Sequence, residues 1–375
     1  MKFHYSCVLL IFFLKLSTAG HAAWAPLAPE SDEFDWIQLK SGEWLKGEIR
    51  TMYQDDMDFK SDVLGELSLD FDDIIVIRSG RPQMVNISTG KKQAESYRKF
   101  IPGGGEEVVT GYLRLEGNEV KVIPEEGGSE RTFSRSDVIS LTAGEPKEFN
   151  YWDAKITLGT NIRKGNVDQG DLLTRTTVRR RTPRSQYYFQ YVGNFSQTED
   201  IQTANNHRLT SYHDFFISKD FFWRTANLDF LKDPFRNINN RTTLGTSFGY
   251  HIFKKGRLIW DVSGGPGYQY IEYDTVEPGE DEIRRHLTGI LLTNYKYELT
   301  SRLDIVGNYS FLYAAEDAGG YNFHSDTTLE TELLSWMDLD ISFIWDFQSD
   351  PVSEGTDSEP HKNDYQLITS LGIEF

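Results

Sequence analysis

The chain has 375 residues and a formal net charge of −18, and aromatic residues make up 14% of it. This acidity argues against nucleic acid as a partner, because contacts to phosphate need a basic surface. After the first residues, no apolar stretch approaches the roughly twenty residues that a transmembrane helix requires. Residence in a membrane would therefore require a closed β-barrel, which satisfies its backbone hydrogen bonds from strand to strand.

Residues 1–23 have the features of a secretion signal. A polar start with Lys2 precedes an apolar run from Val8 to Leu14, and small residues follow. We expect cleavage after Ala22 or Ala23. The only cysteine, Cys7, lies within this signal. The exported chain is therefore expected to have no disulfide and no cysteine-based metal site.

Residues 24–35 are predicted to be a linker, and residues 36–145 a small β module of two repeats, at about 36–80 and 107–144. The spacing supports the repeat, since 27 positions separate Gly47 from Ile74 and also Gly111 from Val138. Each repeat is predicted to be a strongly curved sheet, similar to SH3-like or Sm-like barrels. Between them, Gly103–Gly105 is interpreted as a flexible connection, because a phosphate-binding loop would need a helix start and a following lysine.

Residues 151–375 contain twelve stretches that are predicted to form the strands of a transmembrane antiparallel β-barrel. They are expected at 152–164, 171–180, 185–196, 206–218, 223–231, 241–253, 257–272, 284–299, 302–313, 323–335, 337–347 and 361–375. Five connections are short, at 181–184, 219–220, 254–256, 300–301 and 335–336, and those at 197–205, 274–282, 316–322 and 348–361 are longer. Short turns on one rim and long loops on the other are typical of outer-membrane barrels. An even number of strands places both ends of the barrel on one rim, so the module is expected in the periplasm.

The last stretch shows the strand alternation most clearly. Tyr365, Leu367, Thr369, Leu371, Ile373 and Phe375 fall on one side, against Asp364, Gln366, Ser370, Gly372 and Glu374 on the other. A period of two predicts a strand with one apolar face and one wet face. The stretch resembles the final strand of bacterial outer-membrane barrels, which implies that Leu371, Ile373 and Phe375 form an insertion signal read by the barrel-assembly machinery. The alternative is a soluble sandwich that ends on an edge strand.

Aromatic residues gather near the expected strand ends. They are Tyr151, Trp152, Phe221, Phe222, Trp223, Tyr268, Tyr270, Tyr295, Tyr297, Trp345 and Phe347. In a membrane barrel such residues form girdles at the level of the lipid headgroups, so outer-membrane lipid and lipopolysaccharide are the expected partners. In a soluble barrel the same residues would form a core.

The wet face carries charges of opposite sign on different strands. On the first six strands they are mostly positive: Lys155, Arg163, Arg175, Arg179, Arg208 and Arg241. On the last four they are mostly negative: Asp304, Asp326, Glu330, Glu332, Asp338, Asp340, Asp346 and Asp364. In a closed barrel these would form opposing walls, which predicts a narrow pore with a transverse field that filters small polar or ionic solutes. The alternative is a plug of ion pairs in a lumen that twelve strands leave narrow.

No constellation of residues points to an enzyme. The histidines at 213, 251, 286, 324 and 361 are scattered, and no Gly-x-Ser-x-Gly motif is present. The acidic loops at 274–282 and 350–364 lack the ordered spacing of a calcium loop. We therefore expect no catalytic residue, no cofactor and no metal site.

Several motifs lie close together within the predicted barrel. They include Asp233, Pro234, Phe235, Arg241, Gly245, Gly249, Tyr250, Gly265, Pro266, Gly267 and Tyr268. With these residues the chain resembles the salt-induced outer-membrane protein family, a domain of unknown function, over about residues 151–375. The resemblance implies an outer-membrane barrel with no established activity, and the front module is a departure from that family's core. The run Gly264–Gly267 is also predicted to break or kink the seventh strand.

The sequence therefore predicts a non-enzymatic outer-membrane protein, either structural or a narrow channel for small polar or ionic solutes. The resemblance implies a link to salt or envelope stress. A second hypothesis is a periplasmic binding or tethering protein, in which the module binds an unknown partner and the barrel is an anchor. A third is an outer-membrane hydrolase.

Overall fold

The computed structural model describes residues 25–29, 34–53, 55–88, 106–125, 127–144, 148–163, 169–255, 257–300, 302–314, 320–334, 336–351 and 361–374. The predicted signal at 1–23, most of the predicted linker at 24–35, the Gly103–Gly105 connection and Phe375 lie outside these residues. Within the described residues, no helix has the length and apolar character needed to cross a membrane.

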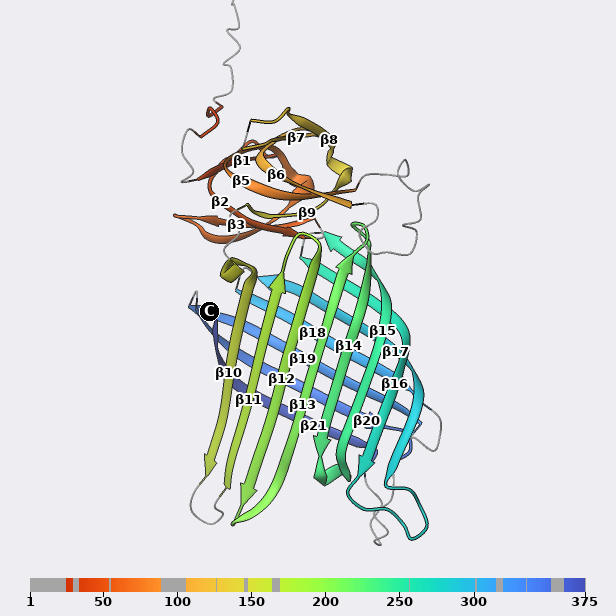
Figure 1. The fold of residues 1–375 in the computed structure, drawn as a ribbon. Coiled ribbons are helices and arrows are strands. Elements are labelled where there is room, and N and C mark those ends of the chain that lie inside the picture. Colours follow the sequence, from red (N-terminus) through yellow and green to blue (C-terminus); the bar gives the residue numbers. More distant parts are fainter. Residues whose placement is uncertain are drawn as a thin grey trace, which may run out of the picture.

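Twelve consecutive antiparallel strands close into a barrel in the second part of the chain (Figure 1). They are β10 (Trp152–Arg163), β11 (Gln169–Arg181), β12 (Ser185–Thr198), β13 (Ile201–Phe216), β14 (Phe221–Asp233), β15 (Ile238–Lys255), β16 (Leu258–Tyr273), β17 (Ile283–Thr300), β18 (Leu303–Tyr313), β19 (Tyr321–Leu334), β20 (Met337–Gln348) and β21 (Asn363–Glu374). The barrel closes where β21 pairs with β10, with Ile373 opposite Ile156 and Leu371 opposite Leu158. The prediction of a twelve-stranded antiparallel barrel is confirmed.

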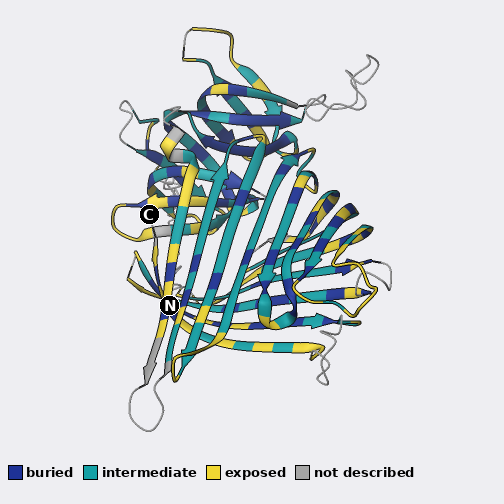
Figure 2. Ribbon diagram, turned by 60° about the horizontal axis from the view of Figure 1, so that its bottom comes forward, coloured by how far each residue is buried: buried dark blue, intermediate teal, exposed yellow. Residues whose placement is uncertain are grey.

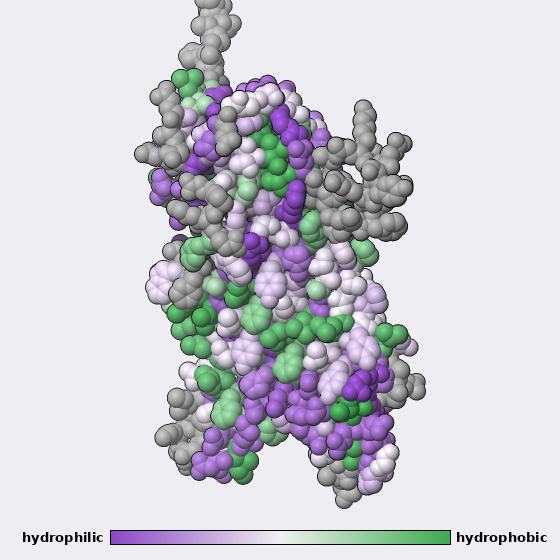
Figure 3. Space-filling view, viewed as in Figure 1, coloured by the Kyte–Doolittle hydropathy of each residue, from purple (hydrophilic) through white to green (hydrophobic). Residues whose placement is uncertain are grey.

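The barrel strands turn apolar side chains outward and polar side chains inward. On β21, Leu367, Leu371 and Ile373 are exposed, whereas Ser370 between them is buried. Buried and exposed residues alternate in the same way along other barrel strands (Figure 2). Apolar side chains gather around the middle of the barrel wall, and hydrophilic ones gather at the end opposite the module (Figure 3). An apolar outer band of this kind is the surface that lipid covers in outer-membrane barrels.

The connection between β12 and β13 differs from the prediction. The loop expected at 197–205 is wrong, because Glu199 and Asp200 alone make the turn, with φ angles of 50° and 62°. Positive φ at both central residues is what a two-residue type I′ hairpin requires. Thr198 pairs directly with Ile201, so the polar residues of this region extend the hairpin. They escaped detection because a strand wetted on both faces shows no alternation.

The N-terminal module is a single nine-stranded sheet. Its strands are β1 (Asp35–Leu39), β2 (Trp44–Tyr53), β3 (Asp56–Ser61), β4 (Gly65–Asp70), β5 (Ile74–Ser88), β6 (Glu106–Glu116), β7 (Glu119–Ile123), β8 (Arg131–Ser134) and β9 (Val138–Ala143). Their order is β4-β3-β2-β1-β5-β6-β7-β8, and β9 pairs with both β2 and β5. Short 3-10 turns, η1 (Phe71–Asp73) and η3 (Arg135–Asp137), precede β5 and β9, and η4 (Glu148–Tyr151) leads into the barrel.

The same elements recur in the module at a spacing of 64 residues. The turns η1 and η3 begin at residues 71 and 135. Gly47 and Gly111 occupy equivalent places, because a Cβ on either would lie 2.2 or 2.3 Å from a carbonyl oxygen of the facing strand. The long strand β5 belongs to both repeats, since its first half pairs with β1 and its second half with β9. The two repeats are therefore fused into one body through a shared strand.

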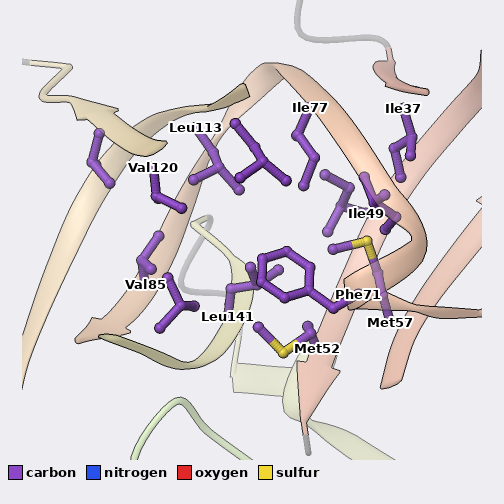
Figure 4. Close-up of a cluster of buried hydrophobic side chains, with 14 of the residues drawn as sticks. Ile37, Ile49, Met52, Met57, Phe71, Ile77, Val85, Leu113, Val120 and Leu141 are labelled. Carbon is purple, nitrogen blue, oxygen red and sulfur yellow. The ribbon is translucent and has the colours of Figure 1, made fainter. Parts of the chain in front are cut away.

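One apolar core fills the module, and Figure 4 shows its side chains pointing toward one another. Among the buried polar residues of the module is Asp35, whose two carboxylate oxygens accept hydrogen bonds from the amides of Ile49 and Gly80, each at 2.9 Å. This side chain ties β1 to β2 and β5. Burial raises the pKa of Asp35, against the opposing effects of these hydrogen bonds and of the Arg81 guanidinium.

The module rests on the end of the barrel that carries the short turns (Figure 1). In the turn between β11 and β12, the carbonyl oxygen of Pro183 accepts a hydrogen bond from Asn86 Nδ2 at 2.9 Å. In the turn between β13 and β14, Lys219 Nζ lies 2.6 Å from Asp55 Oδ1. An apolar cluster of Tyr53, Ile139, Phe216 and Phe222 fills the contact. The module is thus held to this rim by both polar and apolar contacts.

Candidate functional site in the barrel interior

The alternation of the strands brings most of the predicted lumen charges together inside the barrel. Those with contacts across the interior are Lys155, Arg175, Arg208, Arg241, Asp326, Glu330, Asp338, Asp340 and Asp346. The sequence could place them there because each strand side follows a period of two. The pairing of these charges across the lumen could not be predicted from the sequence, because it depends on distances across the closed barrel.

The other predicted lumen charges lie near the strand ends. Arg179 Nη1 is 3.9 Å from the exposed Asp153, and Asp304 Oδ2 is 2.9 Å from Lys296 Nζ. Glu332 is exposed at the end of β19. The carboxylate of Asp364 accepts a hydrogen bond from Gln366 Nε2 at 3.3 Å, and the side chain of Arg163 lies outside the described residues.

Lys155 gathers three carboxylates near the short-turn end. Its Nζ lies 3.3 Å from Glu330, 2.8 Å from Asp338 and 3.2 Å from Asp340. The acidic residues come from β19 and β20, which β21 separates from β10. One ammonium group facing three carboxylates leaves an excess of negative charge at this level of the lumen.

Arg175 crosses the lumen near mid-height. Its Nη2 donates to Asp326 Oδ2 at 2.9 Å, and its Nη1 donates to the hydroxyls of Thr328 and Ser342 at 3.1 and 3.0 Å. Arg175 lies on β11 and Asp326 on β19, four strands away around the barrel. Because both side chains are buried, this ion pair narrows the lumen of the barrel and does not merely line its wall.

Arg208 makes a second crossing, closer to the long loops. Its guanidinium lies 2.9 Å from Asp229 on the neighbouring strand and 3.0 Å from Asp346, five strands away. Asp346 also accepts a hydrogen bond from His324 Nδ1 at 3.0 Å and lies 3.7 Å from Arg236. The interior is therefore pinned at two heights by ion pairs that join opposite walls.

One buried, bidentate ion pair of the interior was not predicted from the sequence. Arg224, which is 1% exposed, donates from Nε and Nη2 to the two oxygens of Asp214, at 2.7 and 3.0 Å. Its guanidinium also stacks on the ring of Tyr212, 3.8 Å from the centroid. With Asp214 and Asp229, the wall predicted to be mostly positive carries two inward carboxylates as well.

A bulge explains why Asp229 was missed. The register of β14 against β15 shifts between Arg224 and Asn227, which moves the inward face from even to odd positions. Asn227, Asp229 and Leu231 then point inward, although a strict period of two from Phe222 places them outside. Bulges that reset a strand in this way leave no clear trace in the sequence.

Between the two crossings, the lumen widens into a cavity of about 70 Å³. Its lining combines aromatic, amide and aliphatic groups, namely Tyr188, Tyr212, Asn227, Asn294, Asn308, Ile290, Leu292 and Leu312. Buried Asn227 Nδ2 and Asp229 Oδ1 have no hydrogen-bond partner in the described part of the chain. The cavity can hold a few water molecules or one very small solute, and it offers such a guest both a donor and an acceptor.

The glycines of the family motif make room for inward side chains. A Cβ on Gly245 or on Gly267 would lie 2.4 Å from Ile290 Cδ1, and one on Gly249 would lie 2.0 Å from Phe222 Cζ. Gly265 lies close to the neighbouring backbone, since its Cβ would be 2.1 Å from the carbonyl oxygen of Thr246. These residues shape the packing of the β14–β17 wall.

The remaining motif residues have structural places. Asp233 ends β14, and Pro234 and Phe235 lie in the connection to β15, where η5 (Pro234–Arg236) is followed by Asn237 with a φ of 59°. Tyr250 and Tyr268 are exposed on the outer face. Of the break or kink predicted at Gly264–Gly267, the break is wrong, because β16 runs without interruption and pairs with β17 through all four residues. On its other side, the pairing of β16 with β15 skips Gly265 and Pro266, where the two backbones approach closely.

Histidines of the barrel wall have hydrogen-bond partners, among them His324 and His213. His324 bonds to Asp346, and His213 Nδ1 lies 2.8 Å from Thr225 Oγ1. In the part of the chain that the structure describes, no group of three or more His, Cys, Asp or Glu side chains could hold a metal ion.

Residues 156–375 match a family model described as a protein of unknown function, DUF481. No curated protein matches the chain. Similar solved structures include the NanC porin, with 11% identity over 60% of this chain and 97% of that chain, at a TM-score of 0.34. An outer membrane channel from Pseudomonas putida F1 has 10% identity over 60% and 94%, at 0.36. The outer membrane channel DcaP of Acinetobacter baumannii has 10% identity over 79% and 95%, at 0.29. At these scores the likeness carries no argument about function.

Proposed function

We propose that this chain, which belongs to the DUF481 family, is an outer-membrane β-barrel that forms a narrow, constricted channel for small polar or ionic solutes. The observation that carries the proposal is the contrast between the two faces of one wall. The outer face is apolar, whereas the inner face holds charged crossings on either side of a polar cavity. An impermeable anchor has no need for such an interior, because apolar packing would fill it at lower cost.

In this proposal the short-turn rim and the module face the periplasm, and the long loops face the outside. Short periplasmic turns and long external loops are the usual arrangement in outer-membrane barrels. The module's contacts at Pro183 and Lys219 fix it beside the inner mouth. A solute that leaves the barrel on this side therefore passes along the module. The link to salt or envelope stress and the tethering and hydrolase hypotheses stay predictions.

The Arg175 crossing provides the test. We expect the purified protein to give small, steady currents in planar lipid bilayers, because the crossing leaves only a narrow path. Arg175→Ala removes the guanidinium that joins β11 to Asp326, so its conductance should rise several-fold. Thr176→Ala is the matched control, since Thr176 is the next residue of the same strand and belongs to the opposite face.

A silent wild type together with a silent Arg175→Ala variant would contradict the channel. The interior would then be an ion-pair plug, and the protein's role structural. Both variants need to migrate as folded barrels on unheated gels, which shows that an altered current comes from the lumen.

A further inference from the structure

The N-terminal module holds one arc of the barrel rim at two neighbouring turns. The turn between β11 and β12 is held at Pro183, whose carbonyl oxygen accepts hydrogen bonds from the buried side chains of Asn86 and Ser140. The turn between β13 and β14 is held at Lys219, whose Nζ lies 2.6 Å from Asp55 Oδ1. On the module side, these contacts come from β5, from β9 and from the turn that follows β2. Three parts of the module sheet therefore converge on the rim.

Tyr53, at the end of β2, is the centre of the apolar contact. It is 7% exposed, and with Ile139 of the module it packs against Phe216 and Phe222 of the barrel. Its ring centroid lies 5.6 Å from that of Phe216 and 5.2 Å from the guanidinium carbon of Arg181. Both barrel rings belong to the inner face of the wall, two positions along their strands from the buried, bidentate ion pair of the interior. The module thus packs against the inside of the mouth as well as its edge.

The acidic start of β3 places a carboxylate over the opening. Asp56, the first residue of β3, is half-buried, and burial raises its pKa. Besides a hydrogen bond from Ser68, two cations lower the pKa of this carboxyl, namely Lys296 on β17 and Arg181 on β11. These strands are six places apart in a barrel of twelve, so they belong to opposite walls. A carboxylate that interacts with cations of both walls lies across the mouth, in keeping with the position of the module over this end of the barrel (Figure 1).

The attachment of the module is small and one-sided. The contacts at Pro183, Phe216 and Lys219 come from four consecutive strands, β11 to β14, and η4 joins the module to the next strand, β10. Among the described residues, the buried apolar part of the contact consists of four side chains. Small interfaces between two parts of one chain allow relative motion. The module therefore has the geometry of a cover that is attached along one side of the mouth.

We propose that the module is a lid on the short-turn mouth of the barrel, held shut through Tyr53 and Lys219, and that organic solutes pass this mouth only when the lid lifts. The inference goes beyond the proposed channel, because a covered mouth requires no current. It gives the module a role of its own, which is to restrict the exchange of organic solutes between the lumen and the space around the module.

The test measures how fast a cysteine inside the lumen reacts with a thiol reagent. Once Cys7 is replaced, Thr177→Cys provides the only thiol. Thr177 shares the inner face of β11 with Arg175, and it lies two positions closer to the short turns, opposite Lys155. The reagent, trimethylammonium-ethyl methanethiosulfonate, is added to the purified full chain in detergent micelles. Because the Arg175 crossing narrows the lumen on the long-loop side, the direct way to this cysteine passes the module.

We expect slow labelling of Thr177→Cys in the otherwise unchanged chain, and labelling about tenfold faster after Tyr53→Ala or Lys219→Ala. Each substitution removes a contact that holds the lid, from the module side in one case and from the barrel side in the other. The loss of a hydrogen bond to a charged group shifts an equilibrium by about tenfold or more, and the labelling rate follows the fraction of open lids. Lys219→Arg keeps the cation at this turn and should restore slow labelling.

Two controls isolate the contact. Glu119→Ala breaks the ion pair of 3.3 Å with Lys121 on β7, at the end of the module away from the barrel, and should leave the labelling rate unchanged (Figure 1). Gln202→Cys, in place of Thr177→Cys, reports the rate of an open site, because Gln202 is exposed at the long-loop end of β13.

Labelling of Thr177→Cys as fast as that of Gln202→Cys in the otherwise unchanged chain would overturn the lid. Unchanged rates in both Tyr53→Ala and Lys219→Ala would do the same. Should Tyr53→Ala fail to fold, Lys219→Ala carries the test, since it alters only a turn of the barrel.

Labelling is measured without current, so the lid and the channel fail separately. A protein that is silent in bilayers, but whose labelling depends on these contacts, refutes the channel and supports the lid. A conducting protein whose labelling ignores both substitutions supports the channel and refutes the lid.

Discussion

The pair formed by Asp214 and Arg224 gives the sharpest prediction about what holds the barrel together. Asp214→Ala leaves the guanidinium of Arg224 buried and without its carboxylate, after the loss of hydrogen bonds of 2.7 and 3.0 Å. Breaking one side of a buried ion pair costs about 3–5 kcal/mol. Stacking on Tyr212 is kept, and the charge of Asp261 lies nearby, bonded to Asn294 at 3.0 Å. We therefore expect the lower end of the range, about 3 kcal/mol.

The double variant Asp214→Ala/Arg224→Met separates the cost of a stranded charge from the loss of packing. Methionine fills the place of the guanidinium without a charge, so the double variant should recover most of the stability that the single variant loses. Urea titration in lipid vesicles, followed by the folded band on unheated gels, measures all three proteins. Asp153→Ala is the control, because Asp153 is exposed and its ion pair with Arg179 is long, at 3.9 Å. This substitution should change stability by less than about 0.5 kcal/mol. A loss below about 1 kcal/mol for Asp214→Ala, or an additive double variant, would refute the reasoning.

Two further predictions concern packing and pH. Gly249→Ala places a Cβ about 2.0 Å from the Phe222 ring, so it should destabilise the barrel by about 1–3 kcal/mol. In a Phe222→Ala background, the same substitution should cost much less, because the ring is gone. Equal losses of stability in urea titrations of the two backgrounds would show that the two residues do not compete for space. Burial raises the pKa of Asp35 in the folded state. The stability that Asp35 contributes to the module is therefore complete below its unfolded-state pKa of about 3.9, and it is lost as the pH rises through the raised folded-state pKa. Hydrogen exchange of the Ile49 and Gly80 amides should therefore accelerate over this pH range by more than the intrinsic effect of pH on exchange. Asp35→Asn should remove this extra acceleration. If the acceleration persists in the variant, a titrating group other than Asp35 causes it.

The barrel was predictable because its physics is local. Along β20, Leu339, Ile341 and Phe343 alternate with Asp338, Asp340 and Ser342, and this pattern alone decides which face meets lipid. The same pattern placed Lys155, Arg175 and Asp346 inside. The pattern does not reveal a strand when both of its faces are polar, as on either side of the Glu199–Asp200 turn.

The features that could not be predicted from the sequence depend on β-bulges and on the closure of the barrel. The shift between Arg224 and Asn227 turns Asp229 inward, and no residue type in that stretch signals it. The contact between Arg208 and Asp346 joins residues 138 positions apart, at a distance set by the diameter of the closed barrel. In the module, the 27-residue spacing revealed the repeats, but not that β5 serves both of them.

The orientation of alternate side chains on β21 tests the account most directly. The sequence contains one cysteine, Cys7, outside the described residues, so once it is replaced a single spin label can be placed at each position from 364 to 371. In lipid vesicles, labels at 365, 367, 369 and 371 should collide with oxygen dissolved in the lipid, and labels at the even positions with a water-soluble nickel complex. Water accessibility at every position, or no period of two, would contradict a barrel with lipid outside and a polar lumen.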